Sequence, residues 1–471
     1  MDRSAASKRP VVEPEEVAEP PYRSADERRS DGKALREAVA REAQGRWTLR
    51  KDRPDPIDLL SQSNVGRLPD LVPIRYGRMM ASPFAFYRGS ACIMAADLAT
   101  TPVSGIKVQV CGDAHLSNFG GFATPERRVI FDINDFDETL PGPWEWDLKR
   151  LVASVVLAGR HIRLPESQTA RAVAATAASY RDHMADYGGM RALDVWYDAI
   201  DADRFLQEME SDETRERVEE RLKKAREKDT PDFLFPKFVE HRGTMPTIAD
   251  DPPLIFHPTA EMAPGVRSRF KEGFESYRNS LAEHVRTLFD RYHFCDLAMK
   301  VVGVGSVGTQ CAIALFMASG DDPIFLQVKE AGASVLEPHV GRSAHPHHGQ
   351  RVVMGQRLMQ SASDLFLGWG RGANGRDFYV RQLRDMKTSA IIEDFDAGDL
   401  RAYGRVCGWA LARAHARSGD AAMIAGYMGS GSTFDEAMQE FAVEYADQVQ
   451  RDHRAFVRAV RQGRVKALIE S

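Results

Sequence analysis

The sequence CGDAHLSNFGGFATPERRVIFDINDFDETLPGPWEWDL, residues 111–148, places acidic side chains at the ends of two short apolar runs. Short apolar runs bounded by turn residues predict β-strands. Carboxylates gathered at neighbouring strand ends repel one another unless a positive group lies among them. The stretch therefore predicts a site at which several acids converge on a cation, which we expect to be a metal ion.

Two groups of polar residues follow the two predicted strands. Asp113 and Asn118 come after the first strand, and Asp132, Asp135 and Asp137 lie at the end of the second. In such an arrangement one carboxylate acts on a hydroxyl, while an amide oxygen and another carboxylate hold Mg²⁺ against phosphate oxygens. The alternative is that these acids cap helices and turns, and the convergence of several of them favours the functional interpretation.

The segment GDAHLSN resembles the catalytic loop of the aminoglycoside and choline phosphotransferase branch of the protein-kinase-like superfamily. The pattern of that loop is HGDxHxxN, and Cys111 stands where the first His usually does. The resemblance implies that Asp113, His115 and Asn118 are the catalytic residues. Asp113 is then the base, and Asn118 is also a magnesium ligand.

The same resemblance selects the second metal ligand. In that branch the metal-binding Asp is followed by a Gly seven residues on and by a buried Asp twelve residues on. Counting back from Gly142 and Asp147 selects Asp135, and it implies that Asp147 braces the catalytic loop. Asp132 and Asp137 remain second choices for the metal.

A kinase also needs a glycine-rich hairpin over the nucleotide phosphates and a lysine on a nearby strand. VVGVGSVGTQCAIALF, residues 301–316, resembles the hairpin, and the strand IFLQVKEA presents the lysine. The resemblance implies ATP and Mg²⁺ as cofactors. The expected nucleotide-binding residues are Gly303, Gly305, Ser306, Gly308, Lys329 and Arg88.

The partner of Lys329 is left open by the sequence. A kinase lysine is normally held by a Glu from the adjacent helix, and the predicted helix 349–366 has no Glu. It offers Met354 and Gln356 on its expected inward face. Glu330 and Glu337 are further candidates, and each is more simply a surface charge.

The order of these segments differs from that of an ordinary kinase. YGRVCGWALARAHARSGD, residues 403–420, resembles the helix that leads straight into the catalytic loop, yet the loop lies near residue 113. We therefore expect an α+β, two-lobed, protein-kinase-like fold in circularly permuted order, which costs little when chain ends lie close together. The expected parts are a flexible N-terminal extension (1–45), a mainly helical large lobe with the catalytic and metal-binding loops (46–290), an antiparallel small lobe (291–395) and C-terminal helices that complete the large lobe (396–471).

Long phrases along the chain are similar to a bacterial family, the domain-of-unknown-function 2252 family. They extend from MMASPFAFYRG, residues 79–89, to LARAHARSGD, residues 411–420. This resemblance covers nearly everything from about residue 50 onward. It implies family membership, and it names no substrate.

Composition excludes several other classes of protein. The 471-residue chain carries a net charge of −5, which gives no overall attraction to nucleic acid. No apolar run approaches the ~20 residues of a membrane helix, and the N-terminus lacks the apolar stretch of a signal peptide. The five cysteines are scattered without a CxxC pair, so neither a disulfide framework nor a structural zinc site is expected. We expect a cytoplasmic protein whose partners are a nucleotide and an unidentified acceptor.

Several further motifs have two interpretations. Arg75, Arg78 and Arg88 either clamp phosphate or pair with acids. The loop SAHPHHGQR invites a zinc site, but its histidines neighbour one another or a proline, which disfavours metal there. DINDFDETLPGP lacks the central Gly and the final Glu of a calcium loop, which excludes that class.

The sequence leaves three functions open. The first is an ATP- and magnesium-dependent phosphotransferase that acts on a small-molecule or protein hydroxyl. The second is an NAD(P)-binding oxidoreductase that uses GVGSVG as its dinucleotide loop, with Asp321 or Asp322 on the ribose, and it requires a helix directly after the third glycine. The third is a non-catalytic nucleotide-binding protein.

Overall fold

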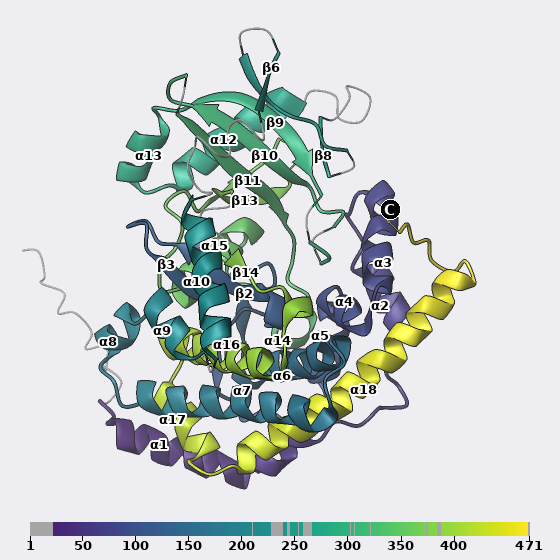
Figure 1. Ribbon diagram of the computed structural model, residues 1–471, viewed down its shortest axis with the longest axis vertical. Helices are drawn as coiled ribbons and strands as arrows, with labels where there is room; N and C mark the ends of the chain where they lie inside the picture. The colour runs from purple at the N-terminus through teal and green to yellow at the C-terminus, as the bar shows by residue number, and fades with distance from the viewer. Residues whose placement is uncertain are drawn as a thin grey trace, which may run out of the picture.

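The structure is a computed structural model, and it describes residues 22–469 apart from 210, 228–238, 243–244, 253, 258–265, 302, 306, 321, 374 and 384–387. Antiparallel sheets and helices alternate along the chain, which confirms the expected α+β class. A six-stranded sheet lies at one end of the molecule and most helices lie at the other (Figure 1). In the described part of the chain, no helix is both long and apolar enough to cross a membrane.

The six-stranded sheet is antiparallel throughout. Its strand order is β12-β13-β11-β10-β9-β8. The strand expected to carry Lys329 is confirmed as β11, and the end of the expected hairpin is β10. Nearly all side chains of β10 and β11 are buried, as in a strand covered on both faces. The strands are β8 (Ile255–Phe256), β9 (His293–Lys300), β10 (Cys311–Met317), β11 (Pro323–Ala331), β12 (Gly368–Arg371) and β13 (Asp377–Gln382).

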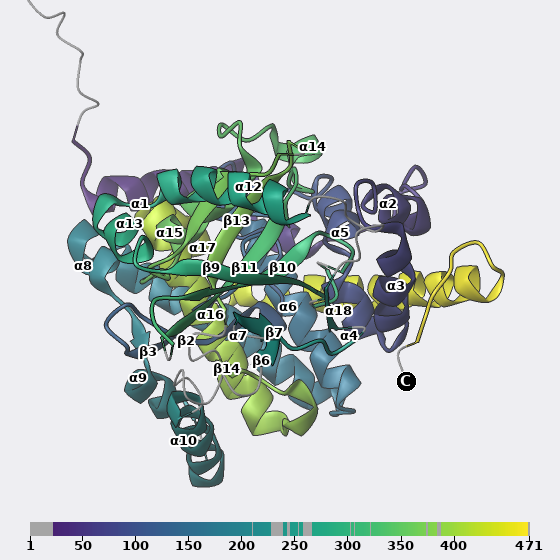
Figure 2. The same cartoon turned by 90° about the horizontal axis from the view of Figure 1, so that it is seen from above.

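Two helices cover one face of this sheet, as the view from above shows (Figure 2). These are α12 (Val266–Ser280) and α13 (Glu283–Phe289). Tyr277 and Phe289 from these helices share a buried cluster with Phe316 of the sheet. The sheet with its covering helices therefore begins before residue 291, earlier than the expected boundary. A hairpin of β6 (Val239–Arg242) and β7 (Met245–Ile248) adjoins it.

Helix α15 (His348–Met359) packs against β13, β12 and β11 and also against α16. The side chain of His347 accepts a hydrogen bond from the Gln350 amide and so caps its N-terminus. The helix ends at Met359, before the predicted end at residue 366. The short helix α14 (Glu337–Val340) precedes it.

The helical part is built on closely packed long helices. α16 lies along α7 because Gly404 and Gly408 face Thr176, where a Cβ on either glycine would collide. The long helix α18 crosses the base of the molecule (Figure 1). These helices are α6 (Trp144–His161), α7 (Glu166–Tyr187), α16 (Ala397–Ser418), α17 (Ala421–Met428) and α18 (Thr433–Arg461), with α8 (Ala192–Tyr197), α9 (Ala202–Gln207) and α10 (Asp212–Glu227) at one side.

The N-terminal region is ordered earlier than expected. Helix α1 (Ala25–Ala34) begins at a capping box between Ser24 and Glu27 and packs on α17. Residues 25–34 are therefore helical, whereas a flexible extension was expected up to residue 45, and 3₁₀ turns follow at 35–37 and 41–45. Residues 1–21 of that extension lie outside the described residues. Four short helices come next: α2 (Pro56–Gln62), α3 (Val72–Met80), α4 (Pro83–Arg88) and α5 (Ala91–Leu98).

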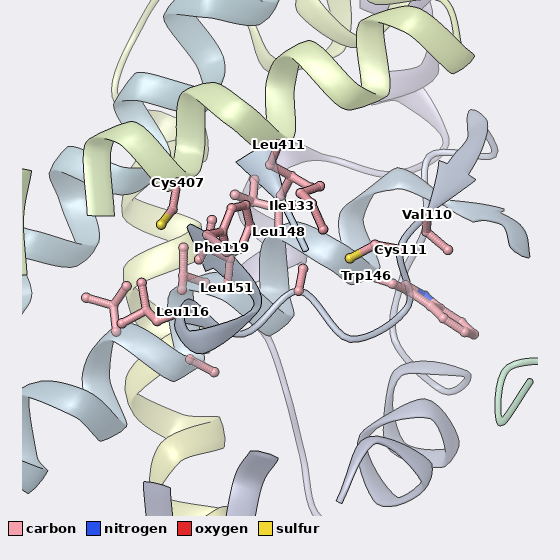
Figure 3. Close-up of a cluster of buried hydrophobic side chains, with 14 of the residues drawn as sticks. Val110, Cys111, Leu116, Phe119, Ile133, Trp146, Leu148, Leu151, Cys407 and Leu411 are labelled. Carbon is pink, nitrogen blue, oxygen red and sulfur yellow. The ribbon is translucent and has the colours of Figure 1, made fainter. Parts of the chain in front are cut away.

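Two small sheets carry the acidic stretch. β1 (Lys107–Val110) pairs with β4 (Leu140–Pro143), while β2 (Phe119–Ala123) and β3 (Val129–Ile133) form a sheet with β14 (Thr388–Ser389) and β5 (Ile200–Asp201). Beneath them, apolar side chains from β1, β3, α6 and α16 form one buried cluster (Figure 3). This core fixes the loops at the strand ends, since Val110, Leu116 and Ile133 are fully buried.

Candidate functional site

Three segments that are far apart in the sequence line one cavity of about 400 Å³. The first runs from α2 to α5, the second includes the acidic loops, and the third is the glycine-rich segment with the end of β11. The acidic and polar residues that line the cavity are Asp113, His115, Asn118, Asp135, Asp137, Glu138 and Glu330; the basic ones are Arg67, Arg75 and Arg88; the glycine-rich segment contributes Gly303, Val304, Gly305 and Thr309.

The loop after β1 is held by a buried carboxylate of α6. The Asp147 side chain accepts hydrogen bonds from the backbone amides of Cys111 at 2.7 Å and Gly112 at 3.0 Å. Gly112 has a φ of +80°, and a Cβ there would meet the Glu138 backbone, so only glycine fits. His415 Nε2 of α16 lies 3.3 Å from Asp147. The structure thus places Asp147 as a brace for this loop, with α16 beside it.

Asp113 forms an ion pair with Arg150 of α6. The Asp113 carboxylate accepts from Arg150 Nε at 2.7 Å and Nη2 at 2.6 Å. Burial raises the pKa of Asp113 to about 6, and Arg150 opposes that rise. A carboxylate with a pKa near the working pH suits a general base, because it is ionised and still takes up a proton readily.

His115 and Asn118 lie beside Asp113 on the same loop. His115 Nε2 is 3.7 Å from the Asp113 carboxylate, and burial lowers the His115 pKa well below its ordinary value, so the ring is neutral. Asn118 Nδ2 donates to the Asp113 backbone carbonyl at 2.8 Å. That hydrogen bond fixes the amide on the cavity wall.

Lys329 of β11, in the six-stranded sheet, forms ion pairs with the acidic loop that contains Asp135 and Asp137. Its Nζ lies 2.5 Å from the Asp137 carboxylate and 3.6 Å from that of Asp135. The Tyr379 hydroxyl of the neighbouring strand β13 donates to Asp137 at 2.7 Å. Although burial of Asp137 acts in the opposite direction, Lys329 and Tyr379 together lower the pKa of its carboxyl. The protein itself thus supplies a positive charge among these acids, in addition to the metal ion that the sequence led us to expect.

Asp132 points away from the cavity. Both of its carboxylate oxygens accept from Arg413 Nη2 of α16, at 2.6 and 2.7 Å, and both side chains are fully buried. The backbone amide of Ser361 donates to it as well. Asp132 is therefore not brought together with the other proposed metal ligands, because the pleat of the fully buried strand β3 turns it inward.

The glycine-rich segment forms turns and then a strand. Gly303 and Gly308 have φ values of +68° and +92°, which other residues rarely adopt. Cys311–Met317 is the strand β10, paired with β9 and β11, so the helix that a dinucleotide-binding unit requires after the third glycine is absent there. Ser306 and Asp321 lie outside the described residues.

The glycine-rich segment is fastened to the helices that precede the acidic stretch. Arg67 Nη1 donates to the Val307 carbonyl at 2.6 Å, and Arg78 Nη1 donates to the Gly303 carbonyl at 2.5 Å. The Leu68 amide donates to the Gly308 carbonyl at 2.7 Å. These bonds hold the loop over the cavity.

In the described residues, none of the other candidate partners forms an ion pair with Lys329. Glu330 forms an ion pair with Arg376, and Gln356 donates to Gln360 at 2.9 Å. Met354 is exposed, so its expected inward position is wrong. Among the described residues, only the two aspartates of the acidic loop form ion pairs with Lys329, which replaces the expected helix partner.

The side chains around the cavity limit how a metal ion could bind. Within the described ranges, no group of three or more His, Cys, Asp and Glu side chains could hold a metal ion, and this includes the histidines of loop 345–348. Mg²⁺, however, is usually held by one or two carboxylates together with substrate phosphates. Asp135, Asp137 and the Asn118 amide fit that second arrangement.

Three groups in or beside the cavity were not anticipated from the sequence: Arg150, Glu138 and Arg67. Arg150 lies three residues after Asp147, and this spacing puts both on the face of α6 that meets the loop, so the pattern was available as a signal. Glu138 accepts from the Val335 amide at 2.7 Å, and burial raises its pKa to about 6. Arg67 had no signal, because it lies in a turn between short helices.

Comparison with known proteins identifies the family. No curated protein and no solved structure matches the chain significantly. One family, described as uncharacterized protein conserved in bacteria, matches residues 67–459, which include every residue that lines the cavity except those of the α2 segment before Arg67. The chain therefore belongs to the bacterial family DUF2252.

Proposed function

We propose that this protein is an ATP- and magnesium-dependent phosphotransferase with a circularly permuted, two-lobed, kinase-like architecture. The proposal rests on one observation, the convergence of three segments on one cavity. The loop with Asp113 and Asn118, the loop with Asp135 and Asp137, and the glycine-rich segment all line the same cavity. A phosphoryl transfer enzyme needs these three kinds of element to meet at the reacting phosphate.

Each group has a role in this proposal. Asp113, with its pKa near 6, takes the proton of the acceptor hydroxyl. Arg150 holds that carboxylate in position through its ion pair. Asn118 and Asp135 would hold Mg²⁺, which supplies charge stabilisation to the nucleotide phosphates, and Asp137 shares this role as a second choice. The cavity-lining residues Gly303, Val304 and Gly305 face the phosphates in this proposal, and Lys329 contributes its charge from beside Asp135 and Asp137.

The oxidoreductase alternative has less support, because a β-strand follows the glycines. The non-catalytic alternative stays open, because a pocket lined by these groups could bind a nucleotide without any turnover. Turnover separates the two alternatives. A phosphotransferase transfers the γ-phosphoryl group of ATP to the acceptor hydroxyl oxygen and releases ADP, at a rate that depends on Asp113.

The test combines binding and turnover. We expect Mg²⁺ to bind weakly to the protein alone and tightly in the presence of ATP, because its protein ligands are too few without phosphate oxygens. ATP with Mg²⁺ should raise the melting temperature, and a ligand at about a hundred times its dissociation constant adds about 2.7 kcal/mol. A shift with NAD and none with ATP would contradict the proposal.

A further inference from the structure

The cavity contains three arginines that lack an acidic partner. Arg67, Arg75 and Arg88 line it, and in the described ranges none of them forms an ion pair with a carboxylate. Buried or partly buried charges in proteins are ordinarily paired, since an unpaired charge in a poorly solvated site is costly. Three such guanidinium groups around one cavity therefore require an explanation.

The hydrogen bonds of these arginines go to neutral oxygens or are missing. Arg75 is 2% exposed, and it donates to the Asn64 side chain at 2.6 Å and to the Gly89 carbonyl at 2.7 Å. Arg67 donates to the carbonyls of Ser63 and Val307. Neutral acceptors orient the guanidinium groups and leave their positive charge uncompensated.

Arg88 is the most informative of the three. Its guanidinium has no hydrogen-bond partner in the described residues, and its Nε is buried without one. Arg75 Nε is buried and unpartnered as well. Buried polar atoms nearly always have partners, so an unpartnered one on a cavity wall indicates a group that binds there.

In the described part of the chain, the acids of the same cavity form no ion pair with these arginines. Burial lowers the pKa of Arg67 and of Arg75, and the charge of Glu138 opposes that fall only at longer range. Arg150 already neutralises Asp113, and Lys329 already neutralises Asp137 and lies near Asp135. Burial lowers the pKa of Arg75 to about 10, and like-charge repulsion from Arg67 contributes to this shift. An entering anion would relieve this repulsion.

From this geometry we infer that Arg67, Arg75 and Arg88 form a binding site for a phosphate group that does not require a metal ion. Guanidinium forks match the oxygens of phosphate, and several forks bind one such group strongly. The phosphate belongs either to the nucleotide or to a phosphorylated acceptor, and both present the same chemistry. The site is inferred from the cavity alone, so it does not depend on ATP being the substrate.

The test is calorimetric titration of the full-length protein with inorganic phosphate, in EDTA and at constant ionic strength. We expect saturable binding by the wild type and at least about a tenfold loss of affinity in Arg88→Gln. Arg171→Gln is the matched control, because it removes the same charge from an exposed position of α7 that bonds only its own helix. Absence of saturable binding, or equal binding by wild type and Arg88→Gln, would overturn the site.

A measurement of thermal stability shows whether a loss of phosphate binding in Arg88→Gln results from misfolding. Because Arg88 has no polar partner, Arg88→Gln should melt at or above the wild-type temperature in the absence of phosphate, and phosphate should raise only the wild-type value. A large fall in the melting temperature would show that Arg88 is structural and would also overturn the site. Arg75→Gln, which loses three hydrogen bonds, is the second variant and should lose phosphate binding too.

The source of the phosphate is decided by repeating the titration with a saturating non-hydrolysable ATP analogue and Mg²⁺. Competition would assign the site to the nucleotide phosphates, and undiminished phosphate binding would assign it to a phosphorylated acceptor. If the analogue fails to bind while inorganic phosphate binds, the proposed phosphotransferase function is wrong and the phosphate site stands.

Discussion

The ammonium group of Lys329 lies 2.5 Å from the carboxylate of Asp137, which stands on a loop of a different sheet. Lys329 is 3% exposed, so the pair is largely shielded from water on the lysine side. The pair links the six-stranded sheet to the acidic loop and places a positive charge among the acids. It therefore compensates part of the negative charge of Asp135 and Asp137, the proposed metal ligands.

Lys329→Met should weaken ATP binding about 10- to 100-fold, because a hydrogen bond to a charged group contributes about 1.5–3 kcal/mol. The substitution also leaves Asp137 without its cation, so we expect a lower free energy of unfolding rather than an unchanged fold. Lys329→Arg keeps the charge and serves as the control. Unchanged ATP affinity in Lys329→Met, measured by calorimetry, would remove Lys329 from the nucleotide site.

Asp113→Asn separates catalysis from binding. If Asp113 is the base, the substitution should lower the transfer rate about 10²–10⁴-fold while ATP and Mg²⁺ still bind, because Asp113 contacts the acceptor hydroxyl rather than the metal. The amide oxygen can still accept from Arg150, which limits disturbance of the loop. A single-turnover assay with radiolabelled ATP measures the rate, and a rate equal to that of the wild type would exclude Asp113 as the base.

Substitutions of Asp132 and Asp135 should affect different properties of the protein, stability for Asp132 and magnesium binding for Asp135. Asp132→Asn leaves the fully buried Arg413 with an uncompensated charge, so it should lower the free energy of unfolding by about 3–5 kcal/mol. Asp135→Asn should weaken Mg²⁺ binding in the presence of ATP with little effect on stability. Urea denaturation and magnesium titration of both variants measure the difference, and a loss of magnesium affinity confined to Asp132→Asn would reverse the assignment.

The raised pKa of Asp113 predicts a pH dependence of stability. Its folded-state pKa of about 6 lies above the ordinary value of 3.8, so its stabilising contribution is fully present below 3.8 and is lost as the pH rises through 6. The wild type should therefore lose stability relative to Asp113→Asn between pH 4 and about 7. Burial is the main cause that raises the pKa of Glu138 to about 6, and Asp113 adds to it only as the last of the named causes. The contribution of Glu138 therefore largely cancels in the difference between the two proteins. If the difference in the free energy of unfolding between the two proteins does not change with pH, the pKa of Asp113 is not raised in the folded state.

Local patterns in the sequence determined the elements that carry the site. Apolar runs bounded by turn residues predicted the strands on either side of the acidic loops, and the glycine-rich segment and the run IFLQVKEA predicted β10 and β11. The structure then placed Asp113 and Asn118 on one loop after the half-buried strand β1. These features depend on neighbouring residues, whose backbone preferences and side-chain periodicity are visible in the chain itself.

Only the tertiary structure decided which charges meet. Lys329 pairs with Asp137 rather than with a Glu of the adjacent helix, Asp113 pairs with Arg150, and Asp132 is turned inward onto Arg413. Each outcome depends on which faces of distant elements pack together. A short sequence pattern does not encode that choice, because ion-pair energies depend on burial and distance, which arise only after the core has formed.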